Sequence, residues 1–549
     1  MIFSSLSMTS YWFIVSAVAF CLYLWLRFSP KQKQDAIAFL VVGDMGRSPR
    51  MQNHAFCAAE CLEGKVPVYL IGSNETPCHS SILQSSAIRI VPLSDLSMYS
   101  ILNKLRGGLT FPLYACVKIF IQSASLVITL FKIPSLRILL VQNPPSIPTL
   151  AIAWGICRIR GVKFFIDWHN YGFTLLRMTL QQTRIPFGSA IVHLSEWIEW
   201  KFGRCADCHF CVSKSMQKTL LQRWGIHAEV LYDRPANAIQ PIDVIRRHCI
   251  LFKYFNKEFL PKHSSDIEVD LSNTSKSCFQ SHFEEKYLTS ETRSHLNCTS
   301  EFKITDNSLI NSLKINEESI CTEMCLTKNG NNSALVTCSI LRKRPAVLIS
   351  ATSWTPDENM FLLLDALVLY EALVKKRCEG ERALPQLFVI ITGKGRTKES
   401  WLMSLSEKNL ENIFVKTLFA PMEDYYRLLA AADVGVSLHY SSSGDDLPMK
   451  IVDMQGVGLP VLAYNFPTAH EQVEEGKNAL LFSSAESLCD RFQEILQGFP
   501  LNFDSCICNK NENGSKMSNL LYCMRTFTEK NRPISIKEEW TAMAKPFFI

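Results

Sequence analysis

The chain has 549 residues, too many for one ordinary hydrophobic core, so we expect two domains with additional segments. Its 57 Lys and Arg nearly balance its 51 Asp and Glu, and the net charge of +6 comes without a long basic run, which argues against nucleic acid as a partner. The 20 cysteines are scattered through apolar segments, so a reducing compartment fits better than a disulfide framework.

The N-terminal region predicts a membrane anchor. Residues 8–26 contain no charged side chain over nineteen residues, which is long enough to span a bilayer. Arg27, Lys31 and Lys33 follow at once and should stay on the cytosolic side. Because these charges come after the apolar stretch, an uncleaved anchor is favoured over a signal peptide. We therefore expect residues 1–34 to form a single-pass anchor with a basic flank.

Residues 35–242 predict one Rossmann-like domain. Short β-branched runs alternate with helical stretches, as in a parallel sheet covered by helices. The expected strands are AIAFLVVGD, VPVYLIGS, RILLVQN, KFFIDW and CHFCVS. Within this domain, the apolar segment 109–131 has two interpretations, a core helix or a segment associated with a membrane face.

Three cysteines in this domain have a spacing that could suit zinc. Cys205, Cys208 and Cys211 are separated by two residues each, but the last two fall in the strand-like run CHFCVS and no second pair follows. We favour buried strand cysteines over a metal site.

The second half of the chain predicts another Rossmann-like domain after a different kind of segment. Residues 243–342 are rich in Ser, Thr, Asn, Lys and Glu, which predicts a low-complexity, largely disordered insertion. Strand-like runs return in residues 343–500, namely AVLISATS, LFVIITG, NIFVKTL, VGVSLHY and LPVLAYN. We expect residues 501–549 to be a tail whose final helix packs back on the N-terminal domain.

The predicted fold class is therefore α/β. Two Rossmann-like domains facing a cleft form the GT-B architecture, which is common among nucleotide-sugar transferases. Ligands of such sheets bind beyond the carboxyl ends of the strands, so the loops after the strands are where functional residues are expected.

One such loop, SSSGDDLPMKIVDM at residues 441–454, carries the chemistry of a nucleotide site. Pro448 suits the first position of a helix, whose N-terminus would present N–H groups to an anion. Lys450 would add a positive charge, and Asp453, on the same helical face as Asp446, could accept both hydroxyls of a ribose. The competing interpretation is a solvated pair between Lys450 and Asp453.

The chain resembles the chitobiosyldiphosphodolichol beta-mannosyltransferases, and the resemblance covers both predicted domains. These enzymes add the first mannose to dolichol-linked chitobiose on the cytosolic face of the endoplasmic reticulum. The stretches that carry the resemblance are VVGDMGRSPRMQNHA, LLVQNPPSIPTLAI, FIDWHNYGFTLL, FGRCADCHFCVSKSM, VLYDRPA, RPAVLISATSWTPDEN, ITGKG and SLHYSSSGDDLPMKIVDMQGVGLPVLAYNFPTAHE.

The resemblance implies GDP-mannose as donor and assigns its binding residues. Related transferases carry two acids eight residues apart; here the second is Asp453, whereas the first is Asp445 by spacing or Asp446 by the mannosyltransferase motif. Many relatives also carry a basic residue where this chain has SATSWTPDEN, so Lys450 and Lys394 are expected to supply that charge. The full set of expected donor-binding residues is Asp446, Lys450, Asp453, Gly393, Lys394 and Glu471.

The N-terminal domain is expected to bind the acceptor, dolichol-diphosphate-linked chitobiose, and to supply a general base. Forming a beta bond from an alpha-linked donor inverts the anomeric centre, which implies one displacement and no covalent intermediate. The candidates for the base are Asp44, Asp167 and His169, of which Asp44 and His169 are preferred. The diphosphate is expected to contact Arg47, Ser48 and Arg50.

No motif requires a cofactor. We expect no tightly bound group and no protein metal site, because no Asp-x-Asp motif stands at a strand end in the donor half; Mg²⁺ is compatible with the sequence but not required. The expected partners are the two substrates, the endoplasmic reticulum membrane and other dolichol-pathway mannosyltransferases. Two alternatives are a catalytically silent paralogue that binds or scaffolds the pathway, and an anchored transferase with another nucleotide sugar.

Overall fold

The computed structural model describes most of the chain, in two compact units. The described residues are 35–93, 111–183, 188–236, 239–255, 299–304, 316–319, 321–328, 334–341, 344–355, 358–376, 384–499 and 520–549. Unit 1 contains the residues up to Asp233 together with Ile536–Ile549, and unit 2 is Arg234–Ser535. The expected anchor, residues 1–34, lies outside the described residues, and within the described ranges no helix is long and apolar enough to cross a bilayer.

Unit 1 is a parallel sheet of seven strands in the order β3-β2-β1-β4-β5-β6-β7. The strands are β1 (Ala36–Asp44), β2 (Val68–Ser73), β3 (Ile88–Pro92), β4 (Leu136–Asn143), β5 (Lys163–Trp168), β6 (Cys208–Cys211) and β7 (Glu229–Val230). The five strands predicted for this domain are confirmed, and β3 and β7 are additions at the two edges.

Both faces of this sheet are buried, which explains why its strands read as nearly continuous apolar runs. Successive residues of β1 belong alternately to two hydrophobic cores, with Ala38 and Leu40 on one face and Ile37 and Phe39 on the other. The helices of unit 1 are η1 (Met45–Arg47), α2 (Pro49–Cys61), α3 (Ser80–Leu83), α5 (Phe111–Lys132), α6 (Thr149–Arg160), α7 (Gly172–Thr183), α8 (Gly188–Gly203), α9 (Lys214–Trp224), α20 (Ile536–Met543) and α21 (Lys545–Phe548).

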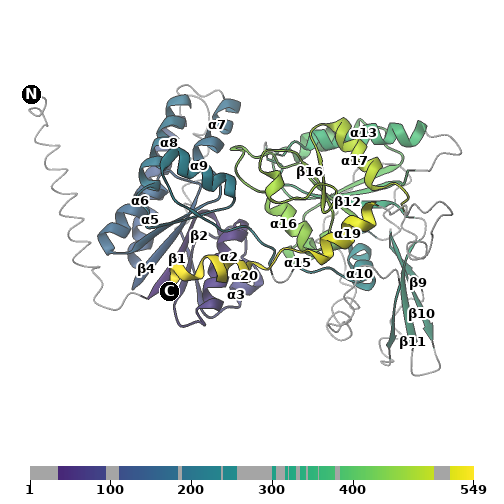
Figure 1. Cartoon of the computed structure of the whole chain (residues 1–549), viewed down its shortest axis with the longest axis horizontal. Coiled ribbons are helices and arrows are strands. Elements are labelled where there is room, and N and C mark those ends of the chain that lie inside the picture. The colour runs from purple at the N-terminus through teal and green to yellow at the C-terminus, as the bar shows by residue number, and fades with distance from the viewer. Residues whose placement is uncertain are drawn as a thin grey trace, which may run out of the picture. The chain divides into compact units, whose positions relative to one another are not determined.

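The C-terminal helices complete one of these cores. Figure 1 shows α20 (yellow) beside α2 (purple), although the two helices come from opposite ends of the chain. The Trp540 indole donates a hydrogen bond to His54 Nδ1 at 3.1 Å. Phe548 is fully buried, and its ring lies within 6.2 Å of the rings of Phe39, Phe165 and Phe210. Residues that follow unit 2 in the sequence are therefore part of the unit 1 core.

The apolar segment 109–131 corresponds to α5, which begins at Phe111. Leu126, Leu130 and Phe131 are buried in the core of unit 1, as the core-helix interpretation predicts. Phe120 and Ile128 are exposed, so the helix also presents apolar side chains outward. Contact of this face with a membrane stays a prediction.

Unit 2 contains a second parallel sheet, in the order β14-β13-β12-β15-β16-β17. Its strands are β12 (Ala346–Ala351), β13 (Leu387–Thr392), β14 (Ile413–Leu418), β15 (Val434–Ser437), β16 (Val461–Tyr464) and β17 (Ala479–Phe482). The five strands predicted here are confirmed, and β17 is an addition.

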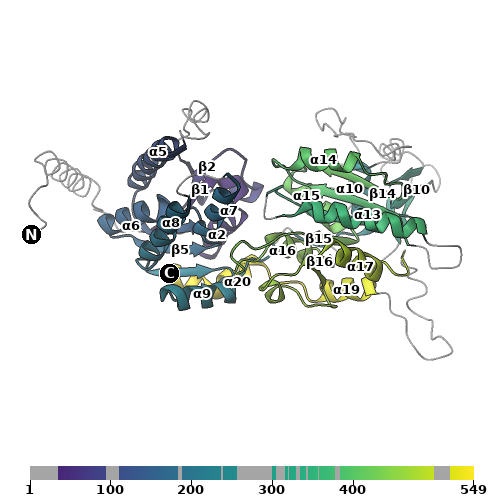
Figure 2. The same ribbon diagram turned by 90° about the horizontal axis from the view of Figure 1, so that it is seen from above.

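The helices of unit 2 are α10 (Val244–Tyr254), α13 (Met360–Lys376), α14 (Lys398–Ser406), α15 (Met422–Ala431), α16 (Met449–Gly456), η6 (Ala469–Glu471), α17 (Ala485–Ile495) and α19 (Leu520–Lys530). Figure 2 shows α13 and α17 side by side.

The expectation of a largely disordered segment at 243–342 is wrong for its described parts. Helix α10 places Ile250, Leu251 and Tyr254 in the same core as β12 and β13. Four antiparallel strands follow in the order β8-β11-β10-β9, namely β8 (Thr299–Ile304), β11 (Ala334–Ile340), β10 (Thr322–Lys328) and β9 (Asn316–Glu318). Figure 1 shows this sheet next to α10. Residues 256–298 lie outside the described residues.

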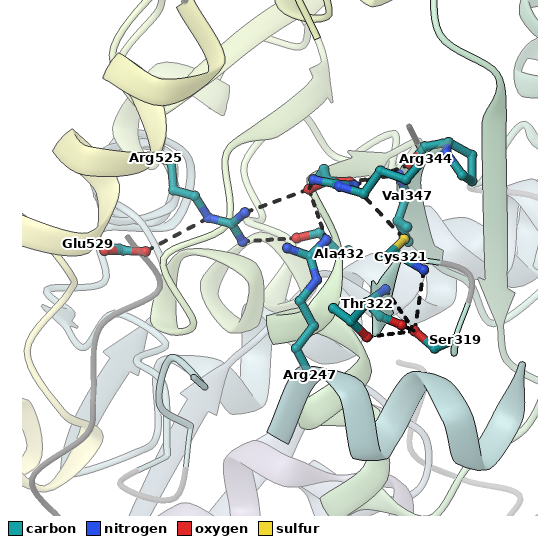
Figure 3. A network of polar contacts seen from close by, with 11 residues as sticks. Arg247, Ser319, Cys321, Thr322, Arg344, Val347, Ala432, Arg525 and Glu529 are labelled. Carbon is teal, nitrogen blue, oxygen red and sulfur yellow. Dashed lines mark hydrogen bonds and ion pairs between the residues drawn. The ribbon is translucent and has the colours of Figure 1, made fainter. Parts of the chain in front are cut away.

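A buried charge network connects α10 to the rest of unit 2. Figure 3 shows Arg247 of α10, Arg344 before β12 and Arg525 of α19 converging from three segments. Asp433 accepts hydrogen bonds from Arg344 at 2.6 and 2.9 Å and from Arg247 at 3.0 Å, and Arg525 lies 4.0 Å away. The Val347 amide donates to the same carboxylate at 2.9 Å.

Asp433 is the shared negative charge of this network, and of the three arginines Glu529 pairs with Arg525 alone, at 3.8 Å. Burial by itself would raise the pKa of Asp433, but Arg344 and then Arg247 outweigh burial and hold the pKa far below its ordinary value. Burial, and then the charge of Arg247, lowers the pKa of Arg525 to about 10. Asp433 therefore compensates arginines that come from three separate segments.

We predict that Asp433→Ala lowers the free energy of unfolding of unit 2 by about 3–5 kcal/mol, because it leaves buried arginines without their counter-charge. Urea unfolding of the full chain, followed by tryptophan fluorescence, measures this change. The matched control is Asp490→Ala, at an exposed position of α17, which should change the free energy by less than about 0.5 kcal/mol. Equal values for the two variants would show that Asp433 does not stabilise the unit.

Candidate active site

Each sheet has one point where the strand order reverses, and the expected site residues lie around these two points. In unit 2 the reversal falls between β12 and β15, and in unit 1 it falls between β1 and β4. Loops that leave two such neighbouring strands run in opposite directions, and ligands of open parallel sheets bind between them. The SSSGDDLPMK loop follows β15 directly and so starts at the reversal point of unit 2.

Asp446 organises this loop from within. Its carboxylate accepts hydrogen bonds from the hydroxyls of Ser441 and Ser443, and His439 Nε2 lies 3.1 Å from Oδ2. The Thr468 hydroxyl donates to the backbone carbonyl of Asp446 at 3.2 Å. Helix α16 begins at Met449 with Pro448 as its N-cap, so Asp446 precedes the helix. The expectation that Asp446 and Asp453 share a helical face is therefore wrong, since Asp446 shapes the loop.

The two candidates for the first acid are both buried in the structure. The Asp445 amide donates a hydrogen bond to the Ser443 hydroxyl oxygen at 3.3 Å. Asp446 holds the loop through its side chain, as described above. The choice between Asp445 and Asp446 as a donor-binding acid stays a prediction.

Lys450 connects α16 to the loop that follows β12. Its Nζ forms an ion pair with Glu358, whose side chain is buried. Glu358 Oε2 also accepts from the Thr352 hydroxyl and from the Ser353 amide, both at 2.7 Å. The ammonium group of Lys450 thus lies at the reversal point, where the Glu358 carboxylate partly neutralises its charge.

Asp453 lies on α16 and is half-buried. Its Oδ2 accepts a hydrogen bond from the Tyr425 hydroxyl of α15 at 3.4 Å. Burial, and then the charge of Asp453, raises the pKa of Tyr425 well above its ordinary value. The Tyr425–Asp453 contact differs from the solvated Lys450–Asp453 pair that the sequence also allowed, and the choice between a donor role and that pair stays a prediction. Glu471, in η6 after β16, is half-buried too.

The loop after β13 meets the loop after β12 backbone to backbone. Gly393 has φ +138°, and a Cβ at this position would lie 1.7 Å from the Thr352 carbonyl oxygen, so only glycine fits. Lys394 Nζ lies 4.1 Å from the centre of the Phe419 ring, a cation–π contact at the end of β14. All six expected donor residues therefore lie in loops or helices that follow β13, β15 and β16, and Gly393 shapes its loop without a side chain.

In unit 1, Asp44 ends β1 and begins the turn to α2. Its Oδ1 accepts hydrogen bonds from the amides of Gly46 and Thr76 at 3.2 and 3.1 Å. Oδ2 makes no hydrogen bond within the described part of the chain, although Arg47 Nε lies 3.5 Å from it. One carboxylate oxygen thus fixes the turn, and the other is buried beside the Arg47 guanidinium.

His169 follows β5, on the other side of β4 from Asp44. The residue is half-buried, and its Nδ1 has no hydrogen-bond partner among the described residues. Asp44 and His169 therefore both fit the position expected for a base at the carboxyl edge of the sheet. Asp167 does not fit, because it is fully buried between Arg50 and His54.

The three residues expected to contact the acceptor diphosphate have different surroundings. Arg47 is exposed on η1, with 73% of its side chain accessible. The Ser48 hydroxyl is buried and donates to Gln142 at 2.8 Å. Arg50 is buried and donates to Asp167 at 2.6 and 2.7 Å and to Asp233 at 2.7 Å. Burial opposes its charge, but Asp167 and then Asp233 outweigh burial and raise the pKa of Arg50. Arg50 is an internal structural residue, which argues against its expected role.

The cysteine motif in unit 1 lies at β6. Cys208 and Cys211 are buried in this strand, as the buried-strand interpretation predicts, whereas Cys205 precedes it and is half-buried. Burial raises the pKa of the Cys208 thiol to about 12. Among the described residues, no group of three or more His, Cys, Asp or Glu side chains is arranged to hold a metal ion.

Sequence comparison identifies the family. Residues 346–498 match the family model described as glycosyl transferases group 1. The chitobiosyldiphosphodolichol beta-mannosyltransferase of Mus musculus is 34% identical over 477 residues, which covers 87% of this chain and 84% of the relative. The Homo sapiens enzyme of the same name is 33% identical, with coverages of 87% and 88%.

The chain belongs to the chitobiosyldiphosphodolichol beta-mannosyltransferase family. A protein named UDP-glycosyltransferase TURAN, from Arabidopsis thaliana, is 34% identical and matches 87% of this chain and 92% of its own length. Among solved structures, a sucrose-phosphate synthase from Thermosynechococcus elongatus aligns with a TM-score of 0.49 at 10% identity, covering 93% of this chain and 97% of that one. This family member is a glycosyltransferase, because its second half matches the group 1 family model. Its two parallel sheets belong to the two Rossmann-like domains of the GT-B fold.

Three residues of this glycosyltransferase were not predicted as site residues and hold its loops in place. Glu358 receives Lys450, His439 contacts Asp446, and Glu199 of α8 contacts the turn that carries His169. Glu199 could have been noticed as one of two acids in the otherwise largely apolar run IVHLSEWIEW, since acids are rarely fully buried without partners. Glu358 and His439 have no comparable signal, because each lies in a loop rich in polar residues.

Proposed function

We propose that this chain transfers mannose from GDP-mannose to dolichol-diphosphate-linked chitobiose and forms the first beta-1,4 linkage. The observation that carries the proposal is the loop at the reversal point of unit 2, where Lys450 and Asp453 follow an Asp446-centred turn inside the glycosyl transferases group 1 region. The names of the relatives supply the acceptor and the mannose.

In the proposed donor complex, the residues of unit 2 have separate roles. Asp453 accepts the ribose hydroxyls, and Lys450 neutralises the diphosphate while Glu358 holds its ammonium group in position. Lys394, Gly393 and Glu471 border the same edge of the sheet. One of Asp445 and Asp446 is the first acid of the family pattern, and Asp446 also holds the loop closed through Ser441 and Ser443.

In the proposed acceptor complex, unit 1 supplies the base. Asp44 or His169 takes the proton of the acceptor hydroxyl while that oxygen attacks the anomeric carbon and GDP leaves from the opposite side. The exposed guanidinium of Arg47 is suited to the lipid diphosphate, because arginine can contact phosphate through two N–H groups. Ser48 and Arg50 support this edge through Gln142 and Asp167. No metal is assigned a step.

We place the protein at the endoplasmic reticulum membrane, with residues 8–26 as a single-pass anchor and both units on the cytosolic face. The uncharged stretch and the basic residues after it support this orientation. Other mannosyltransferases of the pathway are proposed neighbours at this membrane. A silent paralogue is less well supported, since Asp44, His169, Lys450 and Asp453 are all present.

Another nucleotide sugar is the second candidate donor, because one relative is named a UDP-glycosyltransferase. The purified full chain, incubated with phytanyl-diphosphochitobiose, tests both. We expect turnover with GDP-mannose and none above background with UDP-glucose or UDP-N-acetylglucosamine, measured by mass spectrometry of the lipid product. Turnover with a UDP sugar alone would replace the proposed donor, and failure with every donor would favour the silent paralogue.

Asp453→Ala should lower kcat/KM for GDP-mannose by roughly 10²-fold or more, since it removes two hydrogen bonds to a charged acceptor, each worth about 1.5–3 kcal/mol. Steady-state kinetics with varied GDP-mannose measures the loss. Tyr425→Phe is the matched control: it removes only the hydroxyl that donates to Asp453 and should change kcat/KM by less than about three-fold. A near-parental value for a well-folded Asp453→Ala protein would exclude α16 from the donor site.

Two substitutions that nearly preserve side-chain size, Asp44→Asn and His169→Gln, test which residue is the base. Loss of a general base lowers kcat by roughly 10²–10⁴-fold, so we expect one variant to show this loss with an unchanged KM for GDP-mannose. Asn at position 44 keeps an oxygen for the Gly46 and Thr76 amides, so the turn should persist. If neither variant loses more than about ten-fold, the base lies elsewhere.

A further inference from the structure

The turn between β5 and α7 leaves the sheet beside Asn143, the last residue of β4. It contains His169, Asn170 and Tyr171, and α7 begins at Gly172. A turn at the end of a buried strand has backbone amides that need acceptors other than water. In this turn, four consecutive amides are satisfied by internal groups.

Asn143 supplies the acceptor for the first two amides. Its backbone carbonyl accepts from the amides of His169 at 2.9 Å and Asn170 at 3.3 Å. Its side-chain amide donates to the Asn170 carbonyl at 3.2 Å. The next amide, that of Tyr171, donates to the side-chain oxygen of Asn170 at 2.7 Å.

Glu199 of α8 supplies the last acceptor and joins the two sides of the turn. Its Oε1 accepts from the Gly172 amide at 2.6 Å and from Asn143 Nδ2 at 3.1 Å. Glu199 is fully buried, and a Cβ on Gly172 would lie only 2.8 Å from the same Oε1 and 2.7 Å from Ser146 Oγ. One oxygen of Glu199 therefore accepts hydrogen bonds from the first residue of α7 and from Asn143, whose carbonyl in turn accepts from the His169 amide.

Burying an acid costs free energy unless hydrogen bonds or a counter-charge compensate it, and here the Gly172 amide and Asn143 donate to Glu199. Burial raises the pKa of Glu199 to about 7, and hydrogen bonds from Asn143, from the Gly172 amide, from Ser146 and from the Phe173 amide lower it only in part. A half-buried acid on the same helix shows the contrast: Glu196 pairs with Arg223 at 2.5 Å, outside the turn. An apolar side chain at position 199 would bury more cheaply but would leave the Gly172 amide without its acceptor.

We propose that Glu199 is a positioning residue for the transferase reaction: together with Asn143 it clamps the 169–172 turn and so fixes His169 at the acceptor edge of unit 1. The catalytic role of the clamp rests on the proposed function, whereas its contacts do not. Glu199 itself does not touch a substrate. The clamp acts whether His169 is the base or an acceptor-binding residue, because in both roles the imidazole must keep its place at the end of β5.

The test compares Glu199→Leu with Glu199→Gln in the full-length protein. Gln keeps a carbonyl oxygen for the Gly172 amide, so its kcat should stay within about three-fold of the parent value. Leu removes the acceptor, so kcat per folded molecule should fall by roughly 30-fold or more while KM for GDP-mannose stays unchanged, since the donor residues lie in unit 2. Glu196→Gln is the matched control and should behave like the parent.

Hydrogen–deuterium exchange of the peptide that contains residues 169–175 gives a readout that does not need turnover. We expect Glu199→Leu to speed exchange in this peptide by roughly ten-fold or more, and Glu199→Gln and Glu196→Gln to leave it unchanged. If Glu199→Leu fails to fold, Gly172→Ala provides the second variant, because its Cβ would displace Glu199 and Ser146 while every polar group remains.

The outcomes separate the clamp from the proposed function. Unchanged exchange in the Leu or Ala variant would overturn the clamp, and faster exchange with parental kcat would overturn its positioning role. A parental protein that is inactive with GDP-mannose and phytanyl-diphosphochitobiose would count against the proposed function alone, since the exchange measurement would still decide whether the clamp exists.

Discussion

Polar backbone groups at the carboxyl ends of two buried parallel sheets need partners that are not water, and this requirement shapes the site regions of the chain. The same solution recurs in both units: an acidic side chain enters the turn and accepts from its amides or hydroxyls. Asp44 does so after β1, Glu358 after β12 and Asp446 after β15. Each carboxylate supplies an acceptor to polar groups of its loop that would otherwise lack a partner in a buried setting.

Two acids of the same motif, Asp446 and Asp453, have different surroundings in the structure. Asp446 and Asp453 are seven residues apart, yet the first closes a loop and the second lies on a helix beside Tyr425. In unit 1, the two oxygens of Asp44 differ, because Oδ1 holds the turn while Oδ2 has no hydrogen bond in the described residues and lies 3.5 Å from Arg47 Nε. Spacing alone cannot distinguish these cases, since a carboxylate has two oxygens and the fold decides which of them is used.

The sequence predicted the ten main strands because parallel strands buried on both faces leave an unmistakable apolar pattern. It also located the site loops, because they follow those strands. It failed where a charged residue is buried by a distant partner: Arg50 looked like a phosphate ligand, but Asp167 and Asp233, far along the chain, take its guanidinium. Helix α10 was missed for the same reason, since the arginines of VIRRHCILFKY conceal a core face, and Arg247 pairs with Asp433.

The placement of α20 and α21 in the core of unit 1 has a consequence for synthesis on the ribosome. Phe548 joins Phe39 and Phe165 only after the roughly 300 residues of unit 2 have been made. At about 5–20 residues per second, the first unit waits roughly 15–60 s with part of its apolar surface uncovered. During that interval the nascent chain exposes apolar surface of the kind that promotes aggregation. A premature stop between the end of β7 and residue 536 leaves unit 1 without two of its core helices even though every strand of its sheet has been translated.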